Sequence, residues 1–436
     1  MKGTNRETWG SHLGLVLSLV GVAVGLGNVW RFPYMLGMFG GATFLMVYIA
    51  LVLALGVPGL IVELAISRYV RRGPFRAFTE LGVPGGRAIG ATLLLTALAA
   101  AAYYLVVVGW VLWYLLLSVT GALFEGGVSA ASVFEELIGS PYLQLIMHSV
   151  VVALCVLVVS GGIRRGVELA SKLVMPAVYA ILAGIAIYAL SLPRAFDGLA
   201  FYLSPDWSRI SGPTLLAAMG QVFFSLGLGS TCIFIYGSYM SRSHSVVRSA
   251  VAVAFGDTLA SFIAGLAILP LAYVFNVSPS SGPPLTFITL PEIFRQLPYG
   301  RAISALFFTA LLLAALLSAV PCFEIFVEAL DSYGVSRRRG VALMGLIEVV
   351  LGIPSIVSLD ILLYNDLLWG TTMLPMASLF SIVAFGWFLD RRVLLKELRL
   401  EREGVAWKAL YYWVRLAMPL MVVLVLIYGW ISFLTG

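Results

Sequence analysis

The sequence predicts an all-α polytopic membrane protein with about 11 transmembrane helices, built as two inverted five-helix repeats in which helices 1 and 6 are broken. Composition is the first observation: of 436 residues, 61% are hydrophobic and only 11% are charged. The second is a series of apolar runs of bilayer-spanning length. The third is a pair of glycine-interrupted runs at corresponding places in the two halves of the chain.

The apolar runs are divided by charged or Pro/Gly-rich breaks, and each has roughly the 20 residues that a transmembrane helix needs. They lie near 11–36, 41–67, 88–120, 142–161, 167–191, 212–240, 247–277, 300–330, 339–357, 362–389 and 408–434. We expect one domain over 1–436, with the first five-helix repeat at 11–191, the second, inverted repeat at 212–389 and an extra C-terminal helix at 408–434.

Lys and Arg concentrate in the loops that follow the even-numbered spans, as in Arg71-Arg72 and Arg164-Arg165. Basic loops remain in the cytoplasm, so this alternation predicts a cytoplasmic N-terminus and an extracellular C-terminus. The N-terminus is polar and no cleavage site follows a short apolar core, so we expect no signal peptide. The net charge of +6 lies in these loops and therefore does not indicate nucleic-acid binding.

The remaining chemistry-bearing residues exclude several classes of function. The three histidines are scattered without metal-ligand spacing, and the three cysteines lie in apolar runs, so no disulfide framework is expected. The sequence shows neither a Ser/His/Asp arrangement nor paired carboxylates, and we expect no enzymatic activity.

The first span carries Gly21, Gly25, Gly27 and Asn28 near its centre. Glycine weakens a helix by about 1 kcal/mol relative to alanine, and unpaired backbone survives in hydrocarbon only where it lines a polar cavity. We therefore expect two half-helices joined by an unwound segment at about 22–27, which presents carbonyl groups to a cation and N–H groups to an anion. A closely packed helix rich in small residues is the alternative.

The sixth span has a similar interruption, GQVFFSLGLGST at 220–231. Two interrupted helices five spans apart are typical of inverted-repeat transporters, which place their binding site between the two breaks. An unrelated small-residue helix is again the alternative.

Asp257 lies deep in the seventh span, where a carboxylate needs a cation or a proton. Together with Asn28, Ser225 and the freed carbonyl of Ala23, it offers the oxygen atoms that a hard monovalent cation takes. A protonated Asp257 is the alternative, because burial favours the neutral acid.

Other charged residues also lie within the spans. Arg31 and Asp366 occupy the outward halves of the first and tenth spans and are predicted to form a gate pair; interfacial side chains that reach water are the alternative. Glu63, at the end of the second span, could accept hydrogen bonds from the free N–H groups of the broken sixth helix.

Several separated segments resemble the neurotransmitter:sodium symporter family, which includes the bacterial leucine transporter. They are GVAVGLGNVWRFPY (21–34), the Tyr103-Tyr104 pair, GQVFFSLGLG (220–229), GDTLASFIAG (256–265), SAVPCFE (318–324) and the sequence around Asp366 and Pro375. The resemblance spans almost the whole chain. It implies the fold of two inverted five-helix repeats and a location in the cell (inner or plasma) membrane of a prokaryote.

The resemblance also implies a role for each matching position. The backbone of Leu26 and Gly27, with Tyr104, would hold an amino-acid carboxylate. The full substrate site would comprise Ala23, Gly25, Leu26, Gly27, Ala100, Tyr104, Phe224, Ser225, Gly227, Ser230, Ser318 and Cys322. A first sodium site maps to Ala23, Asn28, Ser225 and Asp257, and a second to Gly21, Val24, Ala314, Leu317 and Ser318. Arg31, Asp366 and Gln221 match an outer gate, and Arg6, Trp9 and Asp331 match an inner gate.

Two departures from the family pattern bear on the ions. Leu317 stands where family members usually place a hydroxyl or carboxylate ligand, so one sodium site is expected and the second is in doubt. Asp257 stands where animal members mostly have Asn, and Ser261 occupies the position of a chloride-ligating Ser. A fixed carboxylate so close to that position could replace chloride, and we expect no chloride requirement.

The predicted function is sodium-coupled import of an amino acid by alternating access. Gly25 occupies the position where amine transporters carry an Asp, so the substrate should bring its own carboxylate. Ala100, Gly227 and Ser230 are small and leave space, which favours a bulky hydrophobic or aromatic side chain because each buried CH₂ is worth about 0.8 kcal/mol. The alternatives are a proton-coupled amino-acid transporter that uses Asp257 and a membrane sensor that binds an amino acid without transporting it.

Overall fold

The computed structural model describes residues 7–127, 129–277 and 285–435, and this part of the chain is almost entirely helical. Nine helices in it are long and apolar enough to cross a bilayer, and a pair bent by 53°, His12–Ala23 with Gly27–Met38, makes a tenth candidate span. The predicted sixth span consists of two short helices, α11 (Gly212–Ser225) and α12 (Cys232–Ser238), which bring the described part to the predicted number. The prediction of an all-α membrane protein is confirmed.

The first repeat predicted from the sequence contains the following helices. They are α1 (His12–Ala23), α2 (Phe32–Met38), α3 (Ala42–Leu51), α4 (Val57–Val70), α5 (Pro74–Glu80), α6 (Gly86–Thr120), α7 (Ala130–Ile138), α8 (Pro141–Ser160) and α9 (Leu169–Leu190). π-Helical turns continue α2 and α9 backwards, at Gly27–Arg31 and Ile163–Glu168, and a third, Val52–Gly56, joins α3 to α4 into one span.

The second half continues after the short helix α10 (Ala195–Leu203) with α11 and α12. It comprises α13 (Val246–Val274), α14 (Leu290–Gln296), α15 (Gly300–Asp331), α16 (Arg337–Val357), α17 (Leu359–Asn365), α18 (Leu374–Val383), α19 (Arg391–Leu398), α20 (Val405–Tyr412) and α21 (Met418–Thr435). π-Helical turns at Asp366–Met373 and Ala384–Phe388 make α17 and α18 one span, and Trp413–Ala417 joins α20 to α21. The exact limits of the two repeats stay a prediction.

The helices begin and break where their sequences favour it. Ser11, Ser211 and Ser245 cap α1, α11 and α13, because each side chain accepts a hydrogen bond from a backbone N–H of the first turn. α1 ends at Ala23, and Val24 then adopts an extended backbone (φ −78°, ψ 114°), which places the break inside the predicted segment 22–27.

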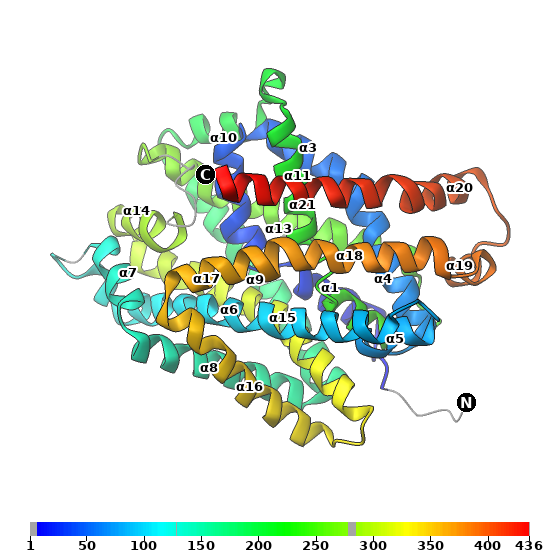
Figure 1. The fold of residues 1–436 in the computed structure, drawn as a ribbon. Helices are drawn as coiled ribbons and strands as arrows, with labels where there is room; N and C mark the ends of the chain where they lie inside the picture. The colour runs from blue at the N-terminus through cyan, green and yellow to red at the C-terminus, as the bar shows by residue number, and fades with distance from the viewer. Residues whose placement is uncertain (1–6, 128, 278–284, 436) are drawn as a thin grey trace.

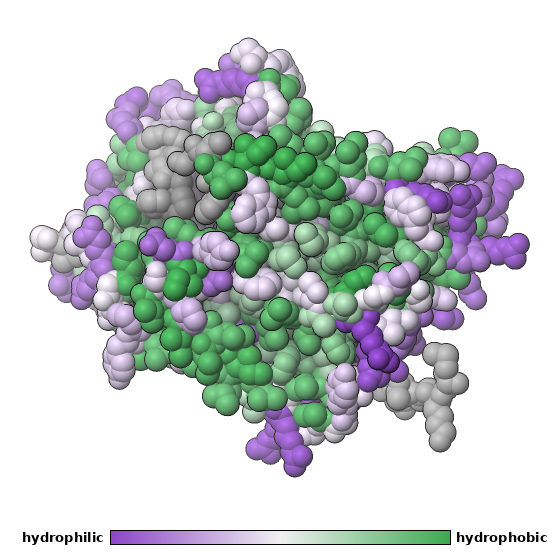
Figure 2. All heavy atoms as spheres, in the orientation of Figure 1, coloured by the Kyte–Doolittle hydropathy of each residue, from purple (hydrophilic) through white to green (hydrophobic). Residues whose placement is uncertain are grey.

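The helices pack in two sets that meet where α15 contacts α1, α9 and α12. α6, α8, α15 and α16 pack on one another, while α12 packs on α4, and α13 packs on α1, α4 and α9 (Figure 1). Figure 2 shows a broad hydrophobic band on this face, with hydrophilic residues gathered at the two ends toward which the long helices run. A band of this kind suits contact with lipid tails.

Candidate functional site

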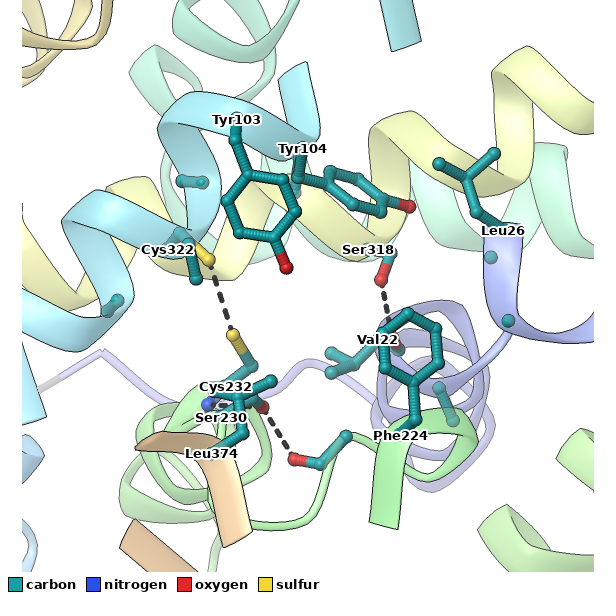
Figure 3. A pocket seen from close by; sticks show the side chains of 18 residues that line it. Val22, Leu26, Tyr103, Tyr104, Phe224, Ser230, Cys232, Ser318, Cys322 and Leu374 are labelled. Carbon is teal, nitrogen blue, oxygen red and sulfur yellow. Dashed lines mark hydrogen bonds between the residues drawn. The ribbon is translucent and has the colours of Figure 1, made fainter. Parts of the chain in front are cut away.

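A cavity of about 90 Å³ lies where the two helix breaks meet α6 and α15. One water molecule needs roughly 10–15 Å³ of such volume, so the cavity can hold several atoms of a ligand. Its wall is formed by the first break, the second break, the middle of α6 and the middle of α15 (Figure 3).

The structure brings together the residues predicted for the substrate site, with one exception. The lining includes Ala23, Gly25, Leu26, Gly27, Ala100, Tyr104, Phe224, Gly227, Ser230, Ser318 and Cys322. Ser225 is buried behind this wall, where it belongs to a polar cluster described below. The sequence reasoning missed the other lining residues, namely Val22, Ala97, Ala101, Tyr103, Cys232, Ala319 and Leu374.

Polar groups line the cavity around Gly25, in the first break. A Cβ atom added to Gly25 would lie 3.0 Å from the Tyr104 hydroxyl and 3.3 Å from the Ser318 hydroxyl. The Tyr104 hydroxyl is buried beside the Ser318 side chain and the Leu26 backbone, and it forms no well-aligned hydrogen bond within the described part of the chain. In Figure 3 it points toward Leu26. A hydroxyl donor free to bond, beside the unwound backbone, can bind a carboxylate.

A larger chamber of about 330 Å³ adjoins the cavity. The two share Leu26, Tyr103, Tyr104 and Phe224, so these side chains separate them. Arg31 and Asp366 line the chamber, and no ion pair within 4.0 Å joins them in the regions described. The Arg31 guanidinium instead lies 4.5 Å from the centre of the ring of Phe224, a lining residue of the cavity, in a cation–π contact.

A buried polar cluster lies behind the first break. The Asn28 amide nitrogen donates to Asp257 Oδ1 at 2.7 Å and to Ser225 Oγ at 3.1 Å. Ser225 in turn donates to both carboxylate oxygens of Asp257, at 2.9 and 3.0 Å. Because Asn28, Ser225 and Asp257 come from three helices, these contacts gather one amide, one hydroxyl and one carboxylate at a single point beside the cavity.

Two further side chains complete this cluster. The Tyr48 hydroxyl donates to Asp257 Oδ2 at 2.9 Å, and Ser261 Oγ accepts from Asn28 at 2.8 Å. Tyr48 is fully buried and was missed by the sequence reasoning, because an aromatic residue in an apolar run carries no signal that its hydroxyl meets an acid. All these oxygens are ones that a sodium ion can coordinate.

The candidate second ion site is less polar. Ser318 Oγ donates to the carbonyl oxygen of Val22 at 2.8 Å rather than standing free. Leu317 is buried, and its Cδ1 atom lies 3.1 Å from the position of a Cβ on Gly21. Val24, at the C-cap of α1, and Ala314, on α15, are also buried.

The gate residues occupy separate places. Gln221 Nε2 donates to the Gly27 carbonyl at 3.0 Å, which ties the two broken helices together. Trp9 is buried, and its indole N–H donates at 3.0 Å to the carbonyl of Tyr236 on α12. Asp331 is exposed at the end of α15, and Arg6 lies outside the described residues.

Glu63 stabilises the second break, as the sequence analysis expected. Its Oε1 atom accepts a hydrogen bond of 2.6 Å from the Gly229 amide, and the carboxylate is buried. Gly229 has φ +78°, and a Cβ there would lie 1.9 Å from the Leu374 carbonyl, so only glycine fits. The expectation for Glu63 is confirmed.

A buried cavity between two broken membrane helices, with an oxygen-rich cluster beside it, defines a secondary transporter. Comparison with known proteins specifies which kind: the chain belongs to the sodium:neurotransmitter symporter family, whose model matches residues 6–130 and 135–435. It is therefore a sodium-dependent, multi-pass membrane transporter and not an enzyme.

Individual relatives agree with this assignment. The chain is 31% identical over 446 residues to the uncharacterized sodium-dependent transporter YhdH of Bacillus subtilis, covering 96% of both proteins. It is 29% identical to an uncharacterized sodium-dependent transporter of Haemophilus influenzae, over 97% of this chain and 98% of the relative. Among solved structures, it resembles MhsT in complex with L-phenylalanine, with a TM-score of 0.89, 33% identity, and coverage of 98% of this chain and all of MhsT.

Proposed function

We propose that this protein imports a bulky hydrophobic or aromatic amino acid together with sodium, and that the two ligands bind side by side at the first helix break. The observation that carries the proposal is the contact between an apolar cavity and the cluster of Asn28, Ser225 and Asp257. The similar MhsT was crystallised with L-phenylalanine, which is an amino acid of the proposed class.

The cavity favours an amino acid over an amine. Among the described residues that line it there is no Asp, Glu, Lys or Arg, so the charged groups of a zwitterion have to meet backbone, hydroxyls and a bound cation. The N–H groups around Leu26 and Gly27 and the Tyr104 hydroxyl supply donors for the carboxylate. The rest of the lining is mostly alanine, aromatic and sulfur-containing side chains, which suit an apolar substituent.

The hydrogen bonds of Asp257 favour sodium over a proton as the coupling ion. Three donors, from Asn28, Ser225 and Tyr48, point at its carboxylate oxygens. Donors of this kind stabilise the ionised form of an acid and so oppose burial, which favours the neutral form, and an ionised carboxylate can coordinate sodium. A proton-coupled transporter would instead need Asp257 to gain and lose a proton in each cycle.

We further propose one sodium site, formed by Ala23, Asn28, Ser225 and Asp257, and no chloride requirement. Leu317 and the Val22–Ser318 hydrogen bond support the absence of a strong second site. The basic loops support a cytoplasmic N-terminus and an extracellular C-terminus, which makes the chamber with Arg31 and Asp366 the outer vestibule.

In the proposed cycle, sodium and substrate stabilise each other because the carboxylate completes the ion's oxygen shell. Such coupling between two sites is typically worth about 1–3 kcal/mol. The helices α1, α4, α11, α12 and α13 then move against α6, α8, α15 and α16 and expose the cavity to each side in turn.

The test is uptake of a panel of amino acids by proteoliposomes containing the full chain, with and without a sodium gradient. Tryptophan or leucine should enter in a sodium-dependent manner and should compete better than glycine or alanine. Better competition by glycine or alanine contradicts the substrate class, and uptake driven by a pH gradient without sodium favours proton coupling. Binding without uptake or counterflow favours the sensor.

The ion site is tested by Asn28→Ala and Asp257→Ala. Both variants should lose sodium-dependent uptake while they elute as monodisperse protein in size-exclusion chromatography. Sodium-stimulated uptake retained in both variants would reject the assignment of these residues.

A further inference from the structure

Two of the three cysteines meet at the cavity wall. Cys232 is the first residue of α12, directly after the second break, and Cys322 lies in the middle of α15. Their sulfur atoms are 3.5 Å apart (Figure 3). Both are free thiols that line the cavity; Cys232 is buried and Cys322 is partly accessible. Cys155 is buried on α8 and does not line it.

This sulfur contact is close enough for a bond between the two helices. A disulfide has an S–S distance of about 2.05 Å, so the atoms would have to approach by roughly 1.5 Å. The backbone before Cys232 can supply such a shift, since residues 226–231 form no helix and Gly227, Gly229 and Thr231 all have positive φ angles.

We propose that Cys232 and Cys322 form an oxidation site whose disulfide stops transport. The inference rests on the proposed function, because it assigns the pair an effect on the transport cycle. Small disulfides are the oxidants that we assign to the site, since the cavity is small and only the side chains that it shares with the adjoining chamber separate the two.

The reaction follows thiol–disulfide exchange. The more accessible Cys322 loses its proton, and its thiolate attacks one sulfur of the small disulfide. A mixed disulfide forms, and one thiolate leaves. Cys232 then loses its proton and attacks the Cys322 sulfur, which expels the second thiolate. Two protein thiols are oxidised to one disulfide, and one small disulfide is reduced to two thiols.

The position of the bond explains its expected effect. α12 packs mainly on α4 and touches α15, whereas α15 packs mainly on α6. A covalent link between α12 and α15 therefore joins the two groups of helices that the proposed cycle moves past each other. It also fixes the cavity wall at the point where the second broken helix resumes.

The experiment uses the full chain in proteoliposomes and 2-hydroxyethyl disulfide as the oxidant. After treatment, free thiols should fall from the three of the sequence to a single one, and sodium-dependent tryptophan uptake should fall to background. Dithiothreitol should restore both. Measured against its own untreated uptake, Cys322→Ala should lose nothing on oxidation, because the attacking thiol is gone, and Cys155→Ala, the matched control, should remain sensitive.

The outcomes separate the two proposals. Three free thiols after oxidation, or a disulfide between Cys232 and Cys322 with uptake unchanged, overturns the inference. Inhibition that persists in Cys322→Ala also overturns it, because the oxidant then acts elsewhere. If the untreated protein takes up no amino acid, the proposed function fails, while the thiol count still decides whether the pair can be joined.

Discussion

The substitution Tyr48→Phe isolates the contribution of one hydroxyl to sodium binding. The hydroxyl donates to Asp257 Oδ2 at 2.9 Å in a site closed to water, because Tyr48 and Asp257 are both fully buried. A hydrogen bond to a charged group contributes about 1.5–3 kcal/mol. Losing this donor favours the protonated acid, with which sodium must then compete, so the half-saturating sodium concentration should rise by up to roughly 10- to 150-fold, at 1.36 kcal/mol per tenfold change.

The assay is amino-acid uptake as a function of sodium concentration at saturating substrate. The phenyl ring of the variant keeps the packing of Tyr48 against Phe32, whose ring centre lies 5.0 Å away, so the fold should be preserved. Tyr114→Phe is the matched control, since Tyr114 is also fully buried but its hydroxyl has no hydrogen-bond partner in the described residues. An unchanged sodium dependence in the Tyr48 variant, or an equal change in the control, would refute the reasoning.

Three glycine substitutions test the geometry around the breaks. Gly25→Ala places a Cβ 3.0 Å from the Tyr104 hydroxyl; overpacking of about 1–3 kcal/mol should raise the KM for the amino acid roughly 5- to 150-fold, measured by uptake at saturating sodium. Gly229→Ala should lower the thermal unfolding midpoint in detergent, because its Cβ would lie 1.9 Å from the Leu374 carbonyl and φ is +78°. Gly184→Ala is the control, because Gly184 lies on α9 with open space around it; this variant should be neutral or stabilising by up to about 1 kcal/mol. Equal unfolding midpoints for Gly229→Ala and Gly184→Ala would contradict the claim that position 229 requires glycine.

The breaks could be predicted because their cause is local. Glycines at the centre of an apolar run leave backbone groups that lipid cannot satisfy, so the chain itself indicates where a helix must open. The structure ends α1 at Ala23 and α11 at Ser225, inside the two interrupted stretches. The lining of the candidate cavity could be predicted for the same reason, because many of its residues belong to the two breaks.

Other features depend on contacts between residues far apart in the sequence. Tyr48 meets Asp257 across 209 positions, and Cys232 meets Cys322 across 90. Neither pair has a local pattern, because a tyrosine or a cysteine in an apolar run looks the same whether it packs in lipid or bonds to a partner. The separation of Arg31 from Asp366 likewise depends on the conformation, which composition and spacing do not encode.

Asn28 connects the proposed ion site to the proposed substrate site through the two ends of one amide group. Its nitrogen donates to Asp257, while its oxygen accepts a hydrogen bond of 3.0 Å from the Gly25 amide, on the cavity wall. Sodium is coordinated by oxygen atoms and not by an amide nitrogen. A sodium ion bound beside Asp257 would therefore need the Asn28 amide to rotate so that its oxygen faces the ion. That rotation removes the acceptor from the Gly25 N–H, and a substrate carboxylate can replace it. The coupling between ion and amino acid can therefore begin at a single side chain, before any helix moves. In Asn28→Ala, sodium should no longer increase the affinity for tryptophan, even if tryptophan still binds.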